Sequence, residues 1–309
     1  MRVFKGLHEF YPEKDTVVTV GTFDGIHLGH RQLITMVNEI GQAKNLATTL
    51  LTFDPHPKTV VQAANQKQVE LLTNLDEKLE LLQTTGLETV VVMNFNRELS
   101  QLGYSEFVEN ILLKRLKMQF LVVGYDHAFG KDRAGTLESL EMLRDKHDFG
   151  LHEFQPIKVE GDIVSSSYIR RLISSGDVSR AAKLLGRPYT LKGIVVKGEG
   201  RGRRLSFPTA NISVENHDKL LPREGVYAID CFLSGKVIRG MVNIGYKPTF
   251  GGLDKTVEAH LFDFSGNLYG ELITIGFLQR LREEKKFSDE KQLIEQLKHD
   301  KEISNKITS

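Results

Sequence analysis

Short β-branched or aromatic segments alternate with longer amphipathic segments through the first half of the chain. The expected strands cover residues 17–20, 48–53, 89–93 and 120–123. The expected helices cover residues 30–44, 76–85 and 104–116. This alternation predicts an open parallel sheet with helices on both faces. Ligands of such sheets bind at the carboxyl ends of the strands, so we expect a functional site at that edge.

The pattern changes beyond residue 186. Strand-like segments then follow one another without helices between them, at residues 189–196, 226–232, 237–244, 256–264 and 271–278. They predict an antiparallel meander that closes into a small barrel, followed by an amphipathic helix over residues 289–298. The predicted fold class is therefore α/β plus all-β, with one domain at 1–186 and a second at 187–309.

Composition argues against several classes of protein. The 309 residues carry a formal net charge of +1, so no overall positive potential favours a nucleic-acid or membrane partner. Cys231 is the single cysteine, which leaves no intrachain disulfide. The charged amino-terminal segment lacks the apolar core of a signal peptide, and no apolar run has the length of a membrane helix. We expect a cytoplasmic protein with small-molecule partners; the sequence leaves the oligomeric state open.

The block GTFDGIHLGH, residues 21–30, follows the first expected strand directly. His27 and His30 are three residues apart where a helix should begin, so they share a helix face. A helix amino terminus attracts phosphate, and imidazoles placed there can donate hydrogen bonds as charge develops. Two histidines without a nearby cysteine make an incomplete zinc site. The alternative, histidines that only cap a helix, is less favoured because the whole block lies in a strand–turn–helix context.

This block resembles the signature of the HxGH nucleotidyltransferases, which implies a Rossmann-like domain. In that family the two histidines stabilise the transition state as a phosphate attacks the α-phosphorus of a nucleoside triphosphate and pyrophosphate leaves. Class I aminoacyl-tRNA synthetases share the motif but also have a Lys-Met-Ser-Lys-Ser loop, which this sequence lacks.

Four further blocks narrow the resemblance: TFDPHP (52–57), VVGYDHAFGKDRAGT (122–136), VSSSYIR (164–170) and GEGRGRRLSFPTANI (198–212). Together they resemble the bacterial bifunctional riboflavin kinase/FAD synthetase over nearly the whole chain. The resemblance implies that the N-terminal domain adenylylates FMN to FAD, with His27 and His30 as the catalytic pair. It implies a set of ATP-binding residues there: Gly21, Phe23, Asp24, Gly25, Gly29, Ser166, Ser167 and Arg170. His56 and Asp126 would bind the flavin, while His127 stands where the family commonly has an aromatic residue.

The second domain has no Walker-type phosphate loop, so a kinase there needs a different phosphate-binding segment. By the resemblance, one set of residues binds ATP: Gly198, Gly200, Arg201, Arg204, Pro208, Thr209 and Asn211. Thr209 and Asn211 would supply oxygen ligands to Mg²⁺, and Glu258 would be the general base toward the ribityl 5′-hydroxyl. Asn243 and Arg282 would lie near the flavin. Ser206 replaces the usual glycine before the Phe-Pro-Thr-Ala-Asn element.

The resemblance therefore implies a bifunctional enzyme that converts riboflavin to FMN and FMN to FAD with ATP and Mg²⁺. Two alternatives stay open from the residues. One is another cytidylyl- or adenylyltransferase with an accessory C-terminal domain, which the Phe-Pro-Thr-Ala-Asn block and Glu258 argue against. The other is a flavin-sensing protein without turnover, which the full set of motif residues argues against.

Overall fold

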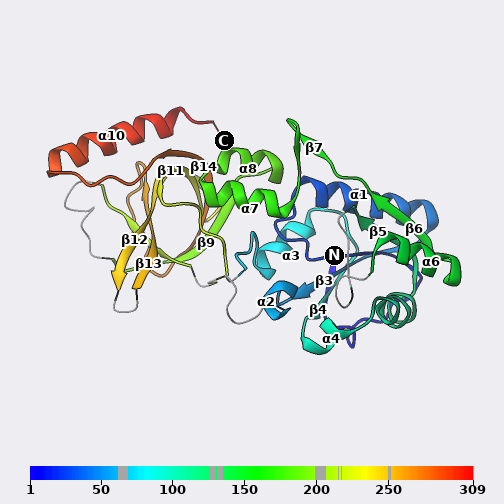
Figure 1. The fold of residues 1–309 in the computed structure, drawn as a ribbon. Coiled ribbons are helices and arrows are strands. Elements are labelled where there is room, and N and C mark those ends of the chain that lie inside the picture. Colours follow the sequence, from blue (N-terminus) through cyan, green and yellow to red (C-terminus); the bar gives the residue numbers. More distant parts are fainter. Residues whose placement is uncertain are drawn as a thin grey trace. The chain divides into compact units, whose positions relative to one another are not determined.

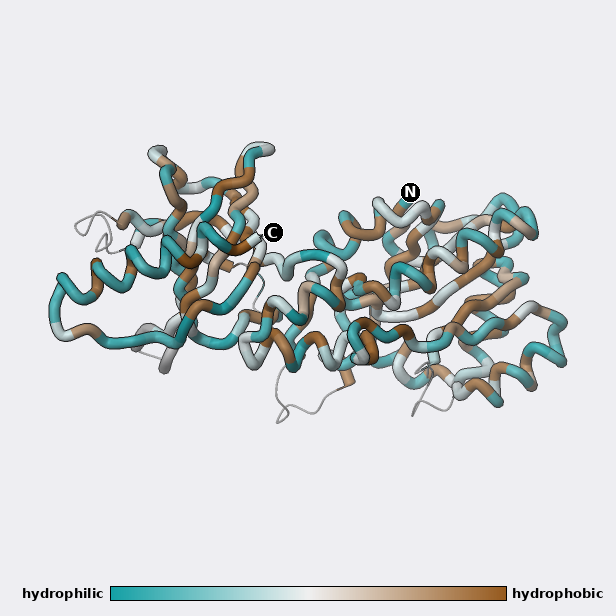
Figure 2. Tube along the Cα trace, turned by 90° about the horizontal axis from the view of Figure 1, so that it is seen from above, coloured by the Kyte–Doolittle hydropathy of each residue, from teal (hydrophilic) through white to brown (hydrophobic). Residues whose placement is uncertain are grey.

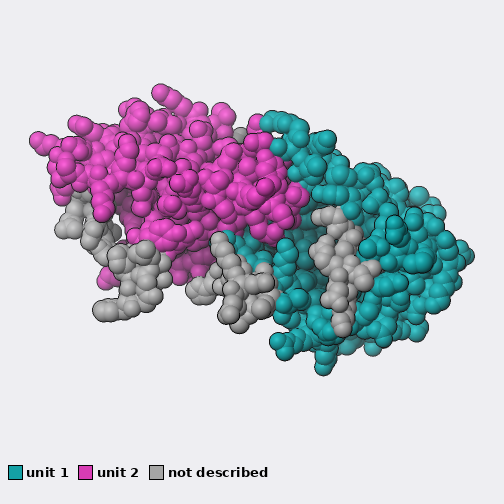
Figure 3. Space-filling model, viewed as in Figure 1, with its two compact units in different colours: residues 1–164 teal, residues 165–309 magenta. Residues whose placement is uncertain are grey.

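A computed structural model describes residues 1–61, 69–125, 130, 135–198, 207–214, 216, 218–249 and 252–308. The chain divides into two compact units, Met1–Val164 and Ser165–Ser309, which Figure 3 colours separately. The sequence-based boundary after residue 186 separates the same sheet from the same barrel and differs only in the helices of residues 166–185. As a division between functions, that boundary stays a prediction.

The first unit contains a six-stranded parallel sheet in the order β1-β4-β3-β2-β5-β6 (Figure 1). Its strands are β1 Arg2–Lys5, β2 Thr16–Val20, β3 Ala47–Asp54, β4 Thr89–Asn94, β5 Met118–Gly124 and β6 Gly150–Phe154. The chain winds from β2 through β3 to β4 and then returns to the other side of β2 with β5. This reversal makes the carboxyl ends of β2 and β5 the topological switch point of the sheet, where ligands of open α/β folds bind.

Helices cover both faces of this sheet. They are α1 Leu28–Lys44, α2 Pro57–Val61, α3 Leu75–Gln83, α4 Arg97–Gln101, α5 Tyr104–Glu106, the π-helix η1 Phe107–Arg115 and α6 Leu137–His147. Val17 packs in one core with Ile34 of α1 and Leu82 of α3. Its neighbour Val18 points to the opposite face and packs in a second core with residues of η1 and α6. Figure 2 shows hydrophobic stretches along the strands and alternating colours along the helices. The predicted α/β layering is confirmed.

The predicted helix over 76–85 begins slightly earlier, because Asn74 caps it. The side chain of Asn74 accepts from the backbone N–H of Glu77 at 2.8 Å, and Glu77 accepts from the N–H of Asn74 at 3.0 Å. This reciprocal capping box fixes the start of α3. A short antiparallel pair, β7 Lys158–Val159 and β8 Asp162–Ile163, precedes the end of the first unit.

The second unit is a closed barrel in the order β10-β13-β12-β11-β14-β9. Its strands are β9 Tyr189–Val196, β10 Ala210–Ser213, β11 Gly225–Leu233, β12 Lys236–Thr249, β13 Gly252–Leu261 and β14 Leu272–Arg282. All of its strand pairs are antiparallel, as predicted. Helices α7 Ser166–Ser175 and α8 Val178–Leu185 precede the barrel, and α10 Glu290–Lys306 lies along β12 and β14 (Figure 1). In the described part of the chain, no helix combines the length and hydrophobicity that a membrane span requires.

Candidate active sites

The turn between β2 and α1 is tightly folded and is held by hydrogen bonds to Leu72 and Thr73, just before α3. Gly25 has a φ of +86°, a left-handed conformation that glycine adopts without strain. The Asp24 carboxylate is 2% exposed and accepts from the backbone N–H groups of Leu72 at 3.0 Å and Thr73 at 2.9 Å. The N–H of Gly25 donates to Thr73 Oγ1 at 3.0 Å. Asp24 therefore shapes the turn, and its predicted contact with ATP stays a prediction.

The structure brings the two motif histidines together at the start of α1. His27 is the N-cap of the helix, and its Nδ1 accepts from the backbone N–H of His30 at 3.2 Å. The imidazoles stack with ring centroids 3.6 Å apart, and Phe23 packs against His30 at 5.0 Å. Because Nδ1 is an acceptor here, a neutral His27 carries its proton on Nε2 and can donate from that nitrogen.

The loop that carries His56 leaves the sheet beside this turn. It follows β3, which pairs with β2 in parallel register, so both loops leave the same edge. The loop is closed by its own hydrogen bonds: His56 Nδ1 accepts from the N–H of Lys58 at 3.2 Å, and the Thr59 hydroxyl donates to the carbonyl of His56 at 2.7 Å. A cavity of about 210 Å³ lies at the end of β5, lined by Gly124, Tyr125 and residues of α6 and β6. Asp126 and His127 lie outside the described residues.

The VSSSYIR block of residues 164–170 leads into α7 and forms its first turns. Ser165 caps this helix, and its hydroxyl oxygen accepts from the N–H of Tyr168 at 3.3 Å. Ser166 and Ser167 occupy the first helical positions, with Arg170 one turn later. A helix amino terminus with serine hydroxyls and an arginine is suited to phosphate. These three residues belong to the second unit, and their role toward the triphosphate stays a prediction.

The barrel aligns residues that come from three separate segments of the sequence. Asn211 of β10 is the register partner of Glu258 of β13, and Glu258 is in turn the partner of Asn243 of β12. Side chains that face each other across antiparallel strands lie on the same face with Cβ atoms about 5 Å apart. Asn211, Glu258 and Asn243 therefore form one continuous polar row, with the carboxylate between the two amides. We call this set the barrel row.

The segments before the barrel row are fitted closely to it. A Cβ on Gly198 would lie 1.9 Å from Nδ2 of Asn211, so any larger residue at this position would have to displace the Asn211 side chain. On the other side, Nδ1 of His260 is 2.8 Å from the carbonyl oxygen of Pro208. Burial lowers the pKa of His260, which favours the neutral ring that donates this bond. Thr209 is exposed next to it, and Gly200, Arg201 and Arg204 lie outside the described residues.

Replacing Gly198 by alanine is expected to reduce riboflavin phosphorylation about tenfold or more, because the new methyl group would displace the Asn211 side chain and an ångström of misplacement costs rate steeply. FAD formation from added FMN should not change. Chromatography of the flavins formed from riboflavin and from FMN measures both rates. Gly103→Ala is the control, since Gly103 has an ordinary φ of −63° and a Cβ there would meet only Oε2 of Glu106, at an ordinary contact distance of 3.4 Å. Kinase activity unchanged in Gly198→Ala would contradict the tight fit.

The predicted flavin-binding residue Arg282 is engaged in a buried ion pair with the C-terminal helix. Its Nε and Nη2 each donate to Asp300 at 2.9 Å, and the side chains of Arg282 and Asp300 are 14% and 2% exposed. Arg282 is also linked to the barrel row through register, because Val226 pairs with both Asn243 and Arg282. This charged hydrogen-bonded pair fixes α10 against β14, and a flavin contact by Arg282 stays a prediction.

We expect Asp300→Ala to lower the free energy that holds α10 on the barrel by about 3 kcal/mol, since it leaves the buried guanidinium uncompensated. Hydrogen exchange of peptides from α10 and β14 in the full chain measures the change. Asp263→Asn is the control: this carboxylate also binds a lysine of α10 at 2.9 Å, but it is 85% exposed, and asparagine tolerates its φ of +53°. Equal protection of α10 in the Asp300 and Asp263 variants would show that the buried ion pair does not hold α10 on the barrel.

Sequence reasoning missed two residues beneath the β2–α1 turn, Thr73 and Lys78. Lys78 is 6% exposed and donates to the carbonyl of Thr22 and to the hydroxyl of Thr52, both at 3.1 Å. A signal was present: Lys78 lies three residues after Leu75 and four before Leu82, which places a charge on the apolar face of a helix.

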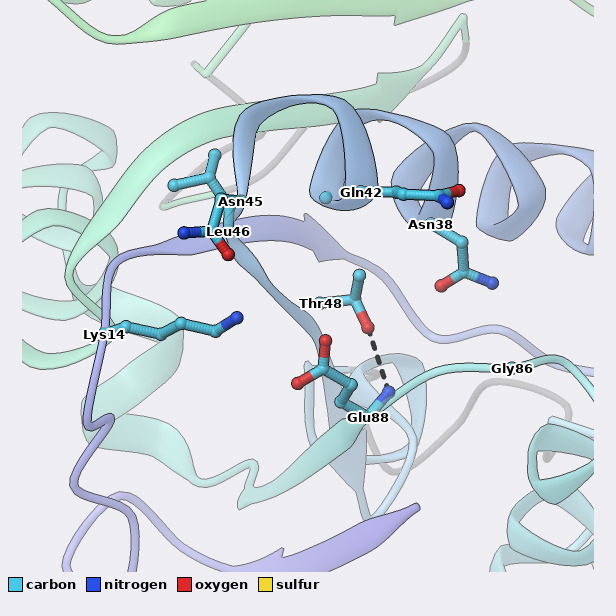
Figure 4. A pocket seen from close by; sticks show the side chains of 9 residues that line it. Lys14, Asn38, Gln42, Asn45, Leu46, Thr48, Gly86 and Glu88 are labelled. Carbon is cyan, nitrogen blue, oxygen red and sulfur yellow. Dashed lines mark hydrogen bonds between the residues drawn. The ribbon is translucent and has the colours of Figure 1, made fainter.

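A second cavity, of about 350 Å³, lies at the opposite edge of the sheet (Figure 4). It is bounded by the end of α1 and the beginnings of β3 and β4, and its lining is polar: Lys14, Asn38, Gln42, Asn45, Thr48 and Glu88 are among its residues. The hydroxyl of Thr48 accepts from the N–H of Glu88 at 2.9 Å. None of the predicted site residues lines this cavity. Among the described residues, no group of three or more His, Cys, Asp or Glu side chains could hold a metal ion.

Comparisons with known proteins agree with this two-part organisation. Residues 11–168 match the family model for FAD synthetase, and residues 185–308 match the model for riboflavin kinase. The bifunctional riboflavin kinase/FMN adenylyltransferase of Bacillus subtilis is 37% identical over 93% of this chain and 90% of its own. The enzymes of that name from Listeria monocytogenes and Escherichia coli are 39% and 33% identical, over 93% and 97% of this chain and 90% and 96% of theirs. The chain belongs to the bifunctional riboflavin kinase/FMN adenylyltransferase family.

A solved structure is similar to this family member over nearly the whole chain. The "Crystal Structure of Macrolide-efflux Protein from Streptococcus pneumoniae" has a TM-score of 0.91 and 31% identity, and the similarity covers 99% of both chains. The similarity shows a shared fold from end to end, and the efflux in that title is a statement about that protein. The predicted combination of an α/β domain with a barrel and a C-terminal helix is therefore confirmed for this chain.

Proposed function

We infer that the chain phosphorylates riboflavin to FMN with ATP and then adenylylates FMN to FAD with a second ATP, releasing pyrophosphate. The observation that supports this conclusion is that the sheet and the barrel each bring together residues of the expected site. The histidine pair lies at the switch point of the parallel sheet, and the barrel row places Glu258 between two amides. We assign the first reaction to the domain of residues 187–309 and the second to the domain of residues 1–186.

In adenylyl transfer, an oxygen of the FMN phosphate attacks the α-phosphorus of ATP, and the bond to the β-phosphate oxygen breaks. His27 donates from Nε2 to the charge that develops on the α-phosphate, because its Nδ1 is occupied by the N–H of His30. The amino terminus of α1 adds a positive partial charge at the same point. Ser166, Ser167 and Arg170 bind the triphosphate, and His56 and Asp126 orient the flavin.

In the kinase reaction, the ribityl 5′-hydroxyl attacks the γ-phosphorus of ATP while Glu258 takes its proton, and ADP leaves. We assign the binding of ATP in this reaction to Gly198, Gly200, Arg201, Arg204, Pro208, Thr209 and Asn211. We assign the binding of the flavin in this reaction to Asn243 and Arg282. Catalysis of this kind consists mainly of positioning and charge stabilisation.

The residues present fit a magnesium ion bound together with ATP. The hydroxyl of Thr209 and the amide oxygen of Asn211 are neutral oxygen ligands two residues apart, and Mg²⁺ takes few protein ligands when phosphates and water complete its shell. Asn211 is also the register partner of Glu258, so the ligand and the base share one face. When bound, the ion would neutralise charge on the transferred phosphate.

Small molecules are the only partners that this function requires. A net charge of +1 gives no support for binding to nucleic acid or to a membrane surface. A single cysteine, Cys231, is buried, which fits the reducing cytoplasm where ATP is available.

A time course with the purified chain, riboflavin, ATP and Mg²⁺ tests the proposal, with the flavins separated by chromatography. FMN appearing first, followed by FAD and pyrophosphate, is the expected result. FMN without FAD would remove the adenylyltransferase assignment. A folded chain that binds flavin and converts none of it would refute the enzyme and favour a flavin sensor.

A further inference from the structure

Lys78 brings a positive charge into the interior of the first unit. Its side chain is 6% exposed and belongs to α3, which packs against the sheet through Leu82. Burial lowers the pKa of Lys78, and the nearby carboxylates of Asp24 and Asp54 oppose that shift. An apolar side chain of similar length would avoid the cost of desolvating a charge. Stability alone therefore does not explain a lysine at this position.

The ammonium group of Lys78 uses its full hydrogen-bonding capacity. An ammonium has three N–H donors. Lys78 Nζ lies 3.1 Å from the carbonyl oxygen of Thr22, 3.1 Å from the hydroxyl of Thr52 and 3.5 Å from the carbonyl oxygen of Phe53. The Thr52 hydroxyl donates to the same Thr22 carbonyl at 3.2 Å, which closes a triangle of three groups. With its donors engaged and its side chain buried, Lys78 does not reach a substrate.

The acceptors come from two separate segments beside the proposed adenylyltransferase centre, the β2–α1 turn and the end of β3. Thr22 lies in the turn that leads from β2 to the histidine pair, one residue after Gly21. Thr52 and Phe53 are at the end of β3, from which the loop with His56 departs. One side chain from α3 thus connects the turn assigned to ATP with the end of the strand that leads into the loop assigned to flavin.

The segment just before α3 makes a second set of hydrogen bonds to the β2–α1 turn. The backbone N–H groups of Leu72 and Thr73 donate to the carboxylate of Asp24, and the hydroxyl of Thr73 accepts from Gly25. Residues 72–78 therefore act as a single support that fixes the turn at two points, one on either side of Phe23.

We propose that Lys78 is a positioning residue for adenylyl transfer, which holds the β2–α1 turn and the end of β3, from which the loop with His56 departs, in one fixed arrangement. This inference rests on the proposed function and deepens it. Reactions between two bound substrates depend strongly on the relative position of the groups that hold them. Loss of the connection should therefore affect turnover more than the binding of either substrate.

The test compares Lys78→Met with Lys158→Met in the full chain. Methionine keeps most of the length of lysine without its donors, and Lys158 is an exposed lysine of the same unit. We expect Lys78→Met to lower kcat for FAD formation about 10–100-fold, with a smaller rise in KM for ATP. The kinase activity of Lys78→Met should equal that of the wild type. Lys158→Met should equal the wild type in both reactions. Lys78→Arg, which restores a charged donor, should recover part of the lost kcat.

Other outcomes separate the inference from its alternatives. A Lys78→Met chain with a lower unfolding temperature but normal kcat per folded molecule would overturn the inference, because it would show a purely structural lysine. If Lys78→Met does not fold, Thr52→Val decides: it removes the shared hydroxyl at a position that is 0% exposed and keeps the side-chain shape. We expect it to lower kcat for FAD formation in the same way, and an unchanged kcat would refute the inference. A wild-type chain that forms no FAD would overturn the proposed function itself.

Discussion

Replacing His27 by asparagine is expected to lower FAD formation from FMN and ATP about 10²–10³-fold, the usual effect of losing one donor to a charge that develops in the transition state. The side-chain oxygen of the introduced asparagine can accept the His30 N–H bond that Nδ1 of His27 now accepts, so the helix cap survives while the Nε2 donor is lost. The rate of FMN formation from riboflavin should not change. Chromatographic assays of the two half-reactions measure both effects in one preparation.

Two further variants separate chemistry from capping. His27→Ala removes both the donor and the cap, and we expect it to unfold more easily than His27→Asn by about 1 kcal/mol. His152→Asn, at an exposed histidine of β6, should behave as the wild type in both assays. Near-normal FAD formation by His27→Asn would refute the assignment of His27 as a catalytic residue.

Replacing Glu258 by glutamine should lower riboflavin phosphorylation about 10³-fold, within the range that a general base contributes. Glutamine has nearly the same shape, so the barrel row with Asn211 and Asn243 should persist, but the amide does not accept the proton of the 5′-hydroxyl. FAD formation from added FMN should remain at the wild-type rate. The same pair of chromatographic assays gives the result.

Glu302→Gln provides the matched control for this experiment, because it makes the same change at an exposed position of α10. Its kinase rate should equal that of the wild type. If Glu258→Gln phosphorylates riboflavin as fast as Glu302→Gln does, Glu258 is a structural strand residue and another group takes the proton.

Patterns with a strong local signal led directly to the fold. The central strands of the sheet could be predicted because both of their faces are buried, which requires continuous runs of β-branched residues such as TVVTV of β2. β1 was not predicted: it lies at the sheet edge with mostly exposed residues, so it lacks the buried pattern. β10 was also missed, because four residues that overlap the Pro-Thr-Ala-Asn motif give no periodic signal.

The predicted helix over 104–116 is helical in the structure, but most of it is the π-helix η1. The N–H of Leu116 donates to the carbonyl of Ile111 at 3.0 Å, five residues back. Sequence periodicity of 3.6 residues does not distinguish this winding from an α-helix over so short a stretch.

The two candidate centres differ in how far the sequence could predict them. His27 and His30 belong to one contiguous block, so chain geometry alone brings them together. Asn211, Glu258 and Asn243 come from distant strands, and their alignment depends on the register of β10, β13 and β12. Register is a tertiary property, so the sequence motifs named these residues without showing that they form a row. Lys78 was invisible to motif analysis because its role arises from contacts with a turn and a strand end that are distant in the sequence.

The central claim is that two separate centres act in sequence on one flavin, and a mixing experiment tests it most directly. His27→Asn and Glu258→Gln chains are each incubated with riboflavin, ATP and Mg²⁺, alone and as an equimolar mixture. We predict that the first alone stops at FMN, that the second alone leaves riboflavin unchanged, and that the mixture forms FAD. A mixture that forms no FAD, with each variant defective in both half-reactions, would contradict the account.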